Sequence, residues 1–225
     1  MKKIKNPLIR RIPKDLIGDW KKYLVVFLFL VLTIGFVSGM YVANESMITS
    51  ANEGVTKYKQ EDGHFELKKQ ADATLLSAIE TGEKADFKAT KTTLYENFFR
   101  NEEEDYNNDG KKDGTIRVFA KTKDINLACM LQGSFPQKAD EIAIDRMHAD
   151  NVGIKVGDTV TVSGETYKVV GLLAYVNYST LHEKTTDLMF DALKFDVAMV
   201  TQDGFDRLHK SIHYTYAWKY ETEPA

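Results

Sequence analysis

The longest apolar run of the chain is Leu24–Ala43, twenty residues without a charged side chain. At about 1.5 Å per residue, such a run forms a helix of roughly 30 Å, which matches the hydrocarbon core of a bilayer. The pattern therefore predicts a transmembrane helix over residues 23–43. The polar residues 44–60 can extend it as a helical stalk. No second run reaches about 18 apolar residues, so the sequence predicts a single span.

The pattern beyond the stalk changes to short alternating segments, which are typical of half-buried strands. The spacing predicts helices at Asp72–Thr81 and from Gln202 onward, and a helical turn at 146–151 that Gly153 ends. These elements predict an α+β domain over residues 44–225, in one body or two lobes. The predicted strands are His64–Leu67, a Thr- and aromatic-rich stretch at Lys88–Arg100, Thr115–Ala120, Glu141–Asp145, Thr159–Val162, Tyr167–Leu173 and Phe195–Thr201.

Charge is distributed unevenly about the apolar run. Residues 1–22 carry eight Lys and Arg against Asp15 and Asp19, a net charge of +6, whereas the whole chain carries −3. Basic residues beside a membrane helix are retained in the cytoplasm. We therefore expect a cytoplasmic N-terminus, a cell-membrane location and an extracytoplasmic main domain. A cleaved signal peptide is the alternative, but its apolar region is usually only 7–15 residues long.

The basic segment also has a helical periodicity. Apolar residues recur every three or four positions from Ile9 to Tyr23, with basic residues between them. This pattern is typical of an amphipathic helix on a membrane surface, and a plain basic anchor is the alternative. The residues that we expect to contact the membrane or a partner are Arg10, Arg11, Leu16 and Trp20.

Composition excludes several classes of protein. Cys129 is the only cysteine, so no intrachain disulfide can form. The acidic main domain argues against nucleic-acid binding. No pairing of a nucleophile with a base stands out, so we do not expect an enzyme. The acidic run Glu102–Asp105 is interpreted as a solvated face, and His148 as an isolated surface or packing residue.

One extended motif resembles a known family. The segments Gly133–Pro136, Glu141–Ile144, His148-Ala149, Gly153–Val160 and Tyr167–Leu172 are similar to the extracytoplasmic core domain of FtsX-like, MacB-type ABC transporter permeases. The basic segment and the membrane helix stand before this domain, as they do in that family. The motif holds turn glycines and alternating valines, so it indicates a scaffold rather than a reactive centre.

The resemblance implies a permease-type membrane subunit. Its partners would be a cytoplasmic ABC ATPase, the lipid bilayer, and a further permease subunit or the remaining membrane helices. Its domain would act on lipid, lipoprotein or peptide substrates. Such permeases carry more membrane helices after the outer domain, so we expect this chain to be an N-terminal piece or a truncated relative. The sequence has no phosphate-binding P-loop motif, so this chain is not the ATPase.

The loop Asp105–Asp113 has the pattern D-x-N-x-D-G-x-x-D. Oxygen ligands at alternating positions around a glycine suit a hard cation, so we identify a candidate calcium site. A metal-free turn before the next strand is the alternative, because the EF-hand's final Glu is replaced by Ile116. The candidate ligands are Asp105, Asn107, Asp109, Lys111 through its carbonyl, and Asp113. This loop favours a second function, a membrane-anchored and calcium-ordered binding or adhesion module.

Overall fold

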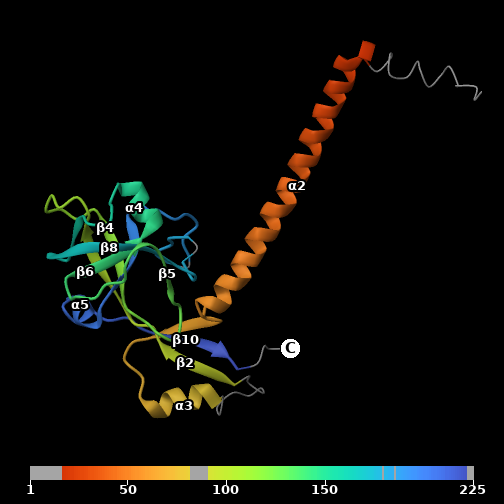
Figure 1. The fold of residues 1–225 in the computed structure, drawn as a ribbon. Coiled ribbons are helices and arrows are strands. Elements are labelled where there is room, and N and C mark those ends of the chain that lie inside the picture. The colour runs from red at the N-terminus through yellow and green to blue at the C-terminus, as the bar shows by residue number, and fades with distance from the viewer. Residues whose placement is uncertain (1–16, 82–90, 179, 185, 222–225) are drawn as a thin grey trace, which may run out of the picture. The chain divides into compact units, whose positions relative to one another are not determined.

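A computed structural model describes residues 17–81, 91–178, 180–184 and 186–221, in two compact units that divide between Glu53 and Gly54. Helix α2, Trp20–Lys57, supplies nearly all of the first unit and its last turn lies in the second (Figure 1). By length and composition α2 can cross a membrane. The predicted continuation of the helix into the polar residues after Ala43 is confirmed. The second, globular unit contains all the strands of the described residues.

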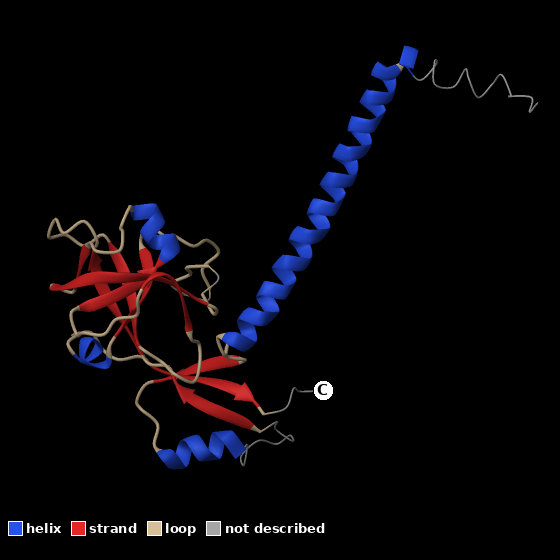
Figure 2. Cartoon of the chain, viewed as in Figure 1, coloured by secondary structure: helices blue, strands red, loops and turns tan. Residues whose placement is uncertain are grey.

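The smaller sheet of the globular unit has three antiparallel strands in the order β1-β10-β2 (Figure 2). They are β1, Gly63–Leu67; β10, Tyr214–Tyr220; and β2, Thr92–Glu96. Helix α3, Ala73–Thr81, packs on β2, where the Leu94 amide donates to Glu80 at 2.9 Å. The last strand of the chain is thus the centre of this sheet, between two strands from its first half.

The larger sheet has seven strands in the order β5-β8-β6-β9-β4-β3-β7. Strand β7 also pairs with the long strand β8, so six strands close into a ring and β5 stays outside on β8. These strands are β3, Phe99–Asp105; β4, Gly114–Ala120; β5, Ala128–Gly133; β6, Glu141–Asp145; β7, Thr159–Val162; β8, Glu165–Tyr175; and β9, Phe195–Val200.

Every second side chain along these strands points into the ring of strands, and these inward side chains form its core. Ile116, Val118, Ile142, Val160 and Val200 are fully or almost fully buried in one cluster. Because successive side chains point to opposite faces, the other face of β4 and β9 packs a second cluster around Phe119 and Val197. This two-sided burial explains why β9 is apolar at nearly every position.

Two short helices complete the unit. Helix α4, Arg146–Val152, begins at Asp145, whose carboxylate accepts from the Met147 amide at 2.7 Å, and ends at Gly153, which has φ 84°. Helix α5, Gln202–Asp206, begins at Thr201. The turn that Gly153 was predicted to supply is therefore observed.

The predicted fold class, an α+β domain after one N-terminal apolar helix, is confirmed. Two details were wrong: the stretch Lys88–Arg100 contains β2 and the start of β3 rather than one strand, and strands β5 and β10 were not predicted. Strand β5 is masked by the uniformly apolar run Leu127–Leu131. Strand β10 does alternate, so a period-two signal was present and was missed: Tyr214, Tyr216, Trp218 and Tyr220 lie on one face, and Thr215, Ala217 and Lys219 on the other.

Candidate functional site

The segment that follows α2 is fastened to the start of β5. The Tyr58 hydroxyl donates to the Cys129 sulfur at 2.8 Å, and the Leu127 amide donates to the Tyr58 carbonyl at 2.8 Å. The Asn126 amide donates to the Lys59 carbonyl at 3.0 Å. These bonds fix the two residues directly after α2 to the start of β5. We call residues 58–62, with the groups that bind them, the root.

Asn126 is the buried centre of the root. It is 1% exposed and has φ 46°, a left-handed conformation that asparagine tolerates better than most residues. Its carbonyl oxygen accepts from the Glu61 amide at 3.0 Å, while its amide group donates to the Glu61 carboxylate at 2.6 Å. One side chain thus satisfies both the backbone and the side chain of Glu61.

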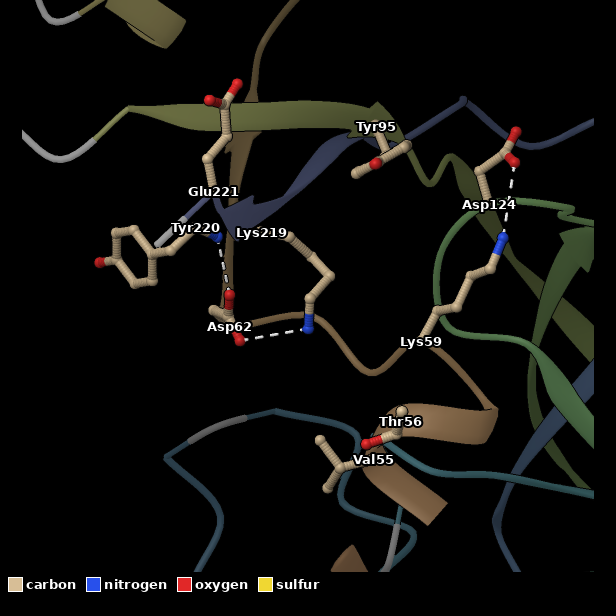
Figure 3. A pocket seen from close by; sticks show the side chains of 9 residues that line it. All are labelled: Val55, Thr56, Lys59, Asp62, Tyr95, Asp124, Lys219, Tyr220 and Glu221. Atoms are coloured by element: carbon tan, nitrogen blue, oxygen red, sulfur yellow. Dashed lines mark hydrogen bonds and ion pairs between the residues drawn. The ribbon is translucent and has the colours of Figure 1, made fainter. Parts of the chain in front are cut away.

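The first and last strands of the globular unit meet at the root (Figure 3). The Asp62 amide donates to the Trp218 carbonyl at 2.9 Å, and the Tyr220 amide donates to the Asp62 carboxylate at 2.8 Å. The Lys219 ammonium donates to the Gln60 carbonyl at 2.7 Å and lies 3.4 Å from Asp62. The chain segment leaving α2 and the C-terminal end of β10 are therefore held side by side.

A pocket of about 660 Å³ opens at the root (Figure 3). Both of its lysines are in ion pairs: Lys59 lies 3.7 Å from Asp124, and Lys219 lies beside Asp62. The pocket is therefore polar, and the charges of its lysines are balanced by neighbouring carboxylates. Its lining residues are Val55, Thr56, Lys59, Asp62, Tyr95, Asp124, Lys219, Tyr220 and Glu221.

A second cleft, of about 490 Å³, is lined by residues of both sheets, and Arg117 of β4 is one of them. The Arg117 guanidinium stacks 4.4 Å from the Phe99 ring. It donates to the Asn101 side chain at 2.9 Å, the Tyr178 hydroxyl at 3.0 Å and the Glu183 carbonyl at 2.9 Å. Arg117 therefore connects the ring of strands to the loop that follows β8.

Two histidines line the same cleft, and each is paired with a glutamate. His64 lies 2.6 Å from Glu61, and His213 lies 2.8 Å from Glu66. His213 also stacks face to face on Phe99 at 4.6 Å. In both pairs the hydrogen bond between histidine and glutamate becomes stronger when the imidazole is charged.

We predict that Glu61→Gln lowers the pKa of His64. The hydrogen bond to Glu61 raises that pKa above its usual value of 6.5. The pair therefore stabilises the fold below pH 6.5, and this contribution is lost as the pH rises through the raised pKa. A titration of the His64 ring followed by NMR, with exposed His209 as internal reference, measures the change. An unchanged midpoint in the variant would show that Glu61 does not hold the proton.

The candidate calcium loop connects β3 to β4. The Asp105 carboxylate accepts from the Asp109 amide at 3.1 Å and from the Gly110 amide at 2.9 Å. The Asn107 side chain also accepts from the Asp109 amide, at 2.9 Å. Gly110 has φ 84°, which provides the predicted sharp turn.

The other predicted ligands form hydrogen bonds within the same loop. The Asp113 carboxylate accepts from the Tyr106 amide at 3.2 Å, and Asp109 accepts from the Lys111 amide at 2.9 Å. All five predicted positions therefore lie in one loop, and four of their side chains bind backbone amides there. Carboxylates held in this way remain acceptors with further lone pairs.

Of the predicted membrane- or partner-contacting residues, Arg10, Arg11 and Leu16 lie outside the described residues. Trp20 is the first residue of α2, and its side chain is 55% exposed. An exposed indole at the end of an apolar helix suits a membrane interface.

The interpretation of the acidic run as a solvated face was wrong. Glu102 and Glu104 are buried because β3 turns alternate residues inward, and Asp105 after them is buried as well. His148, interpreted as a surface or packing residue, is fully buried, where it lies beside the Tyr106 ring and meets Glu104 and Asp196. The period-two spacing of Glu102 and Glu104 was the signal in the sequence that both side chains share one face of a strand. No such signal indicated that Asp196 lies close to His148, because this contact depends on the pairing of β4 with β9.

Comparison with solved structures finds nine similar chains, and two of them are described here. No protein-family model and no curated protein sequence matches the chain. The extracellular domain of the noncanonic ABC-type transporter YknZ from Gram-positive bacteria is similar at 13% identity over 71% of this chain and 84% of that one, with a TM-score of 0.39. The periplasmic region of MacB from Actinobacillus actinomycetemcomitans is similar at 8% identity over 65% of each chain, with a TM-score of 0.38.

Likenesses with TM-scores below 0.5 do not by themselves assign a role. The structural neighbours of this chain are extracellular domains of ABC-type transporters, the kind of protein that its sequence motif resembles, and its apolar helix α2 fits a membrane anchor.

Proposed function

We propose that this chain is a permease-type membrane subunit, or the N-terminal part of one, of an ABC transporter. The observation that carries the proposal is the root. A helix able to cross a membrane ends in a segment that is bonded to the start of β5 and to the end of β10. The sequence motif over residues 133–172 supports the same assignment.

The root can pass motion of the helix end to the rest of the globular unit. The Tyr58 and Asn126 contacts lead to β5 of the larger sheet, and the Asp62 contacts lead to β10 of the small sheet. Since hydrogen-bonded strands move together, displacement of the helix end displaces both sheets. In this proposal the N-terminus is cytoplasmic, an ATPase drives the helix from inside, and the globular unit acts outside on lipid, lipoprotein or peptide substrates.

The test is purification of the full chain from native membranes followed by mass spectrometry of the proteins that accompany it. We expect an ABC ATPase and a second membrane subunit. Arg10→Glu with Arg11→Glu should reduce recovery of the ATPase at least fivefold, because these residues are the proposed cytoplasmic contact. Lys155→Glu with Lys168→Glu is the matched control, since both lysines are exposed on the globular unit.

Purification of the chain without an ATPase or a second membrane subunit would contradict the transporter proposal. It would favour the second candidate, a membrane-anchored binding module in which calcium orders the globular unit. The observation behind this candidate is the loop Asp105–Asp113, where the Asp105 carboxylate and the Asn107 side-chain oxygen accept from the Asp109 and Gly110 amides.

For the calcium candidate we predict that Ca²⁺ raises the melting temperature of the full chain and that Asp109→Asn removes this rise. Asp109 is exposed, so the substitution changes a ligand without disturbing the core. Asp150→Asn, at another exposed acid, is the control and should keep the calcium response. An equal response in Asp109→Asn and the original chain would eliminate this loop as the site.

A further inference from the structure

Three ionisable side chains meet inside the ring. Glu104 of β3, His148 of α4 and Asp196 of β9 each have no exposed surface. Asp196 stands two residues before Ala198, which belongs to the interior cluster, so its side chain points to the same interior face. One oxygen or nitrogen atom of each residue lies within 4.8 Å of the other two. We call Glu104, His148 and Asp196 the buried triad.

The triad has polar atoms that the fold does not satisfy. Both Glu104 carboxylate oxygens, Oδ2 of Asp196 and Nε2 of His148 have no hydrogen-bond partner among the described residues. The other Asp196 oxygen accepts from the Val197 amide at 2.7 Å and from the Asp145 amide at 3.2 Å. Buried polar atoms are almost always satisfied, so unpaired atoms on all three clustered side chains favour a ligand among them.

The orientation of His148 shows what kind of ligand fits. Its Nδ1 lies 2.7 Å from the Ala192 carbonyl, which can only accept, so Nδ1 carries the hydrogen. In the neutral tautomer with its hydrogen on Nδ1, the Nε2 lone pair faces Glu104, whose Oε1 is 3.3 Å away. A lone pair facing a carboxylate oxygen is repulsive unless a positive charge lies between them. An imidazole that donates Nδ1–H to a carbonyl and offers Nε2 is the usual arrangement of a metal-binding histidine.

We propose that the buried triad binds one divalent metal ion, and that the ion is zinc. A divalent ion cancels both carboxylate charges and engages all three side chains. One imidazole nitrogen with carboxylate oxygens is a zinc ligand set, while calcium and magnesium prefer oxygen ligands alone.

The distance between His148 and Glu104 suits this ion. Zinc holds nitrogen and oxygen ligands at about 2.0–2.2 Å, which places two tetrahedral ligands roughly 3.3–3.6 Å apart. The Nε2–Oε1 distance of 3.3 Å lies in this range. The second Glu104 oxygen can supply a fourth ligand. Because all three side chains are fully buried, the site is closed, and the ion holds β3, α4 and β9 together rather than reacting with a substrate.

The first experiment measures metal in the full chain. The protein is purified in detergent, stripped with a chelator, treated with Zn²⁺ and dialysed, and its metal content is measured by mass spectrometry. We expect about one zinc per chain. Zinc at a hundredfold excess over its dissociation constant should raise Tm by about 5–10 °C, and the chelator should reverse the rise.

Two variants test the ligands. Glu104→Gln and Asp196→Asn keep the shape of each side chain but remove its charge. Each should weaken zinc binding more than the roughly 10–100-fold loss that follows a change outside the ligand shell. Asp203→Asn, at an exposed acid in α5, is the matched control and should keep one zinc per chain.

Three outcomes are informative. Stoichiometric zinc that is lost in both triad variants but kept in Asp203→Asn supports the site. Zinc that both triad variants retain lies elsewhere and overturns the proposal. Reconstituted wild-type protein that holds well under one zinc, with a Tm that neither zinc nor chelator moves, also overturns it and leaves the triad as a protonated ion pair. The wild-type measurements decide the matter even if a triad variant fails to fold.

Discussion

Tyr216→Ala is expected to destabilise the globular unit by about 3–5 kcal/mol, as full truncation of a buried aromatic residue does. Tyr216 has no exposed surface and lies in the central strand of the small sheet. Its ring stacks 5.7 Å from Phe65 of β1 and meets the edge of Phe98 at 5.4 Å. Removal of the ring therefore leaves a cavity between the small sheet and its neighbours.

Thermal unfolding of the full chain measures this effect, as a fall in Tm of roughly 6–20 °C. Tyr216→Phe is the matched control. It keeps the ring and removes only the hydroxyl that accepts from the Ala71 amide at 2.9 Å, so about 1 kcal/mol should be lost. Equal losses in the two variants would mean that the hydrogen bond, and not the packing, holds this sheet.

Gly133→Ala is expected to cost about 2–5 kcal/mol. Gly133 has φ 77°, and a side chain in this conformation costs about 1–2 kcal/mol. A Cβ atom there would also collide with the backbone of Val170 and Gly171 in β8, and such overpacking adds about 1–3 kcal/mol. We expect the hydrogen bonds between β5 and β8 to be the first part of the structure to break.

The control for this prediction is Gly164→Ala. Gly164 has φ 86°, but an added Cβ meets no described atom within 4 Å. Only the conformational cost remains, so Gly164→Ala should lose about 1–2 kcal/mol. Denaturant unfolding of both variants separates the two contributions. A loss in Gly133→Ala no larger than that in Gly164→Ala would rule out the collision.

The elements that the sequence predicted best are those with a local signal. Alternating residues indicated β4, β6, β7 and β8, and Gly153 marked the end of α4 because a left-handed residue is needed there. The elements that were missed are held by distant partners. Strand β10 depends on β1 and β2, which lie more than a hundred residues earlier in the chain.

The candidate sites divide in the same way. The loop Asp105–Asp113 is one continuous segment, so its composition and its Gly110 turn were visible in the sequence. The root and the buried triad assemble residues from separate strands. His148 gives no local sign of Glu104 or Asp196, and Tyr58 gives none of Cys129, because strand order and ring closure bring them together.

The position of β10 also sets an order of folding. Strands β1 and β2 do not pair with each other, and β10, which joins them, is synthesised after every other described strand. Closing a contact between Gly63 and Trp218 carries the entropy cost of a long loop, and such non-local pairings form slowly. We therefore expect the small sheet to form only after β10 has been synthesised, so that β1 and β2 lack their partner strand until then.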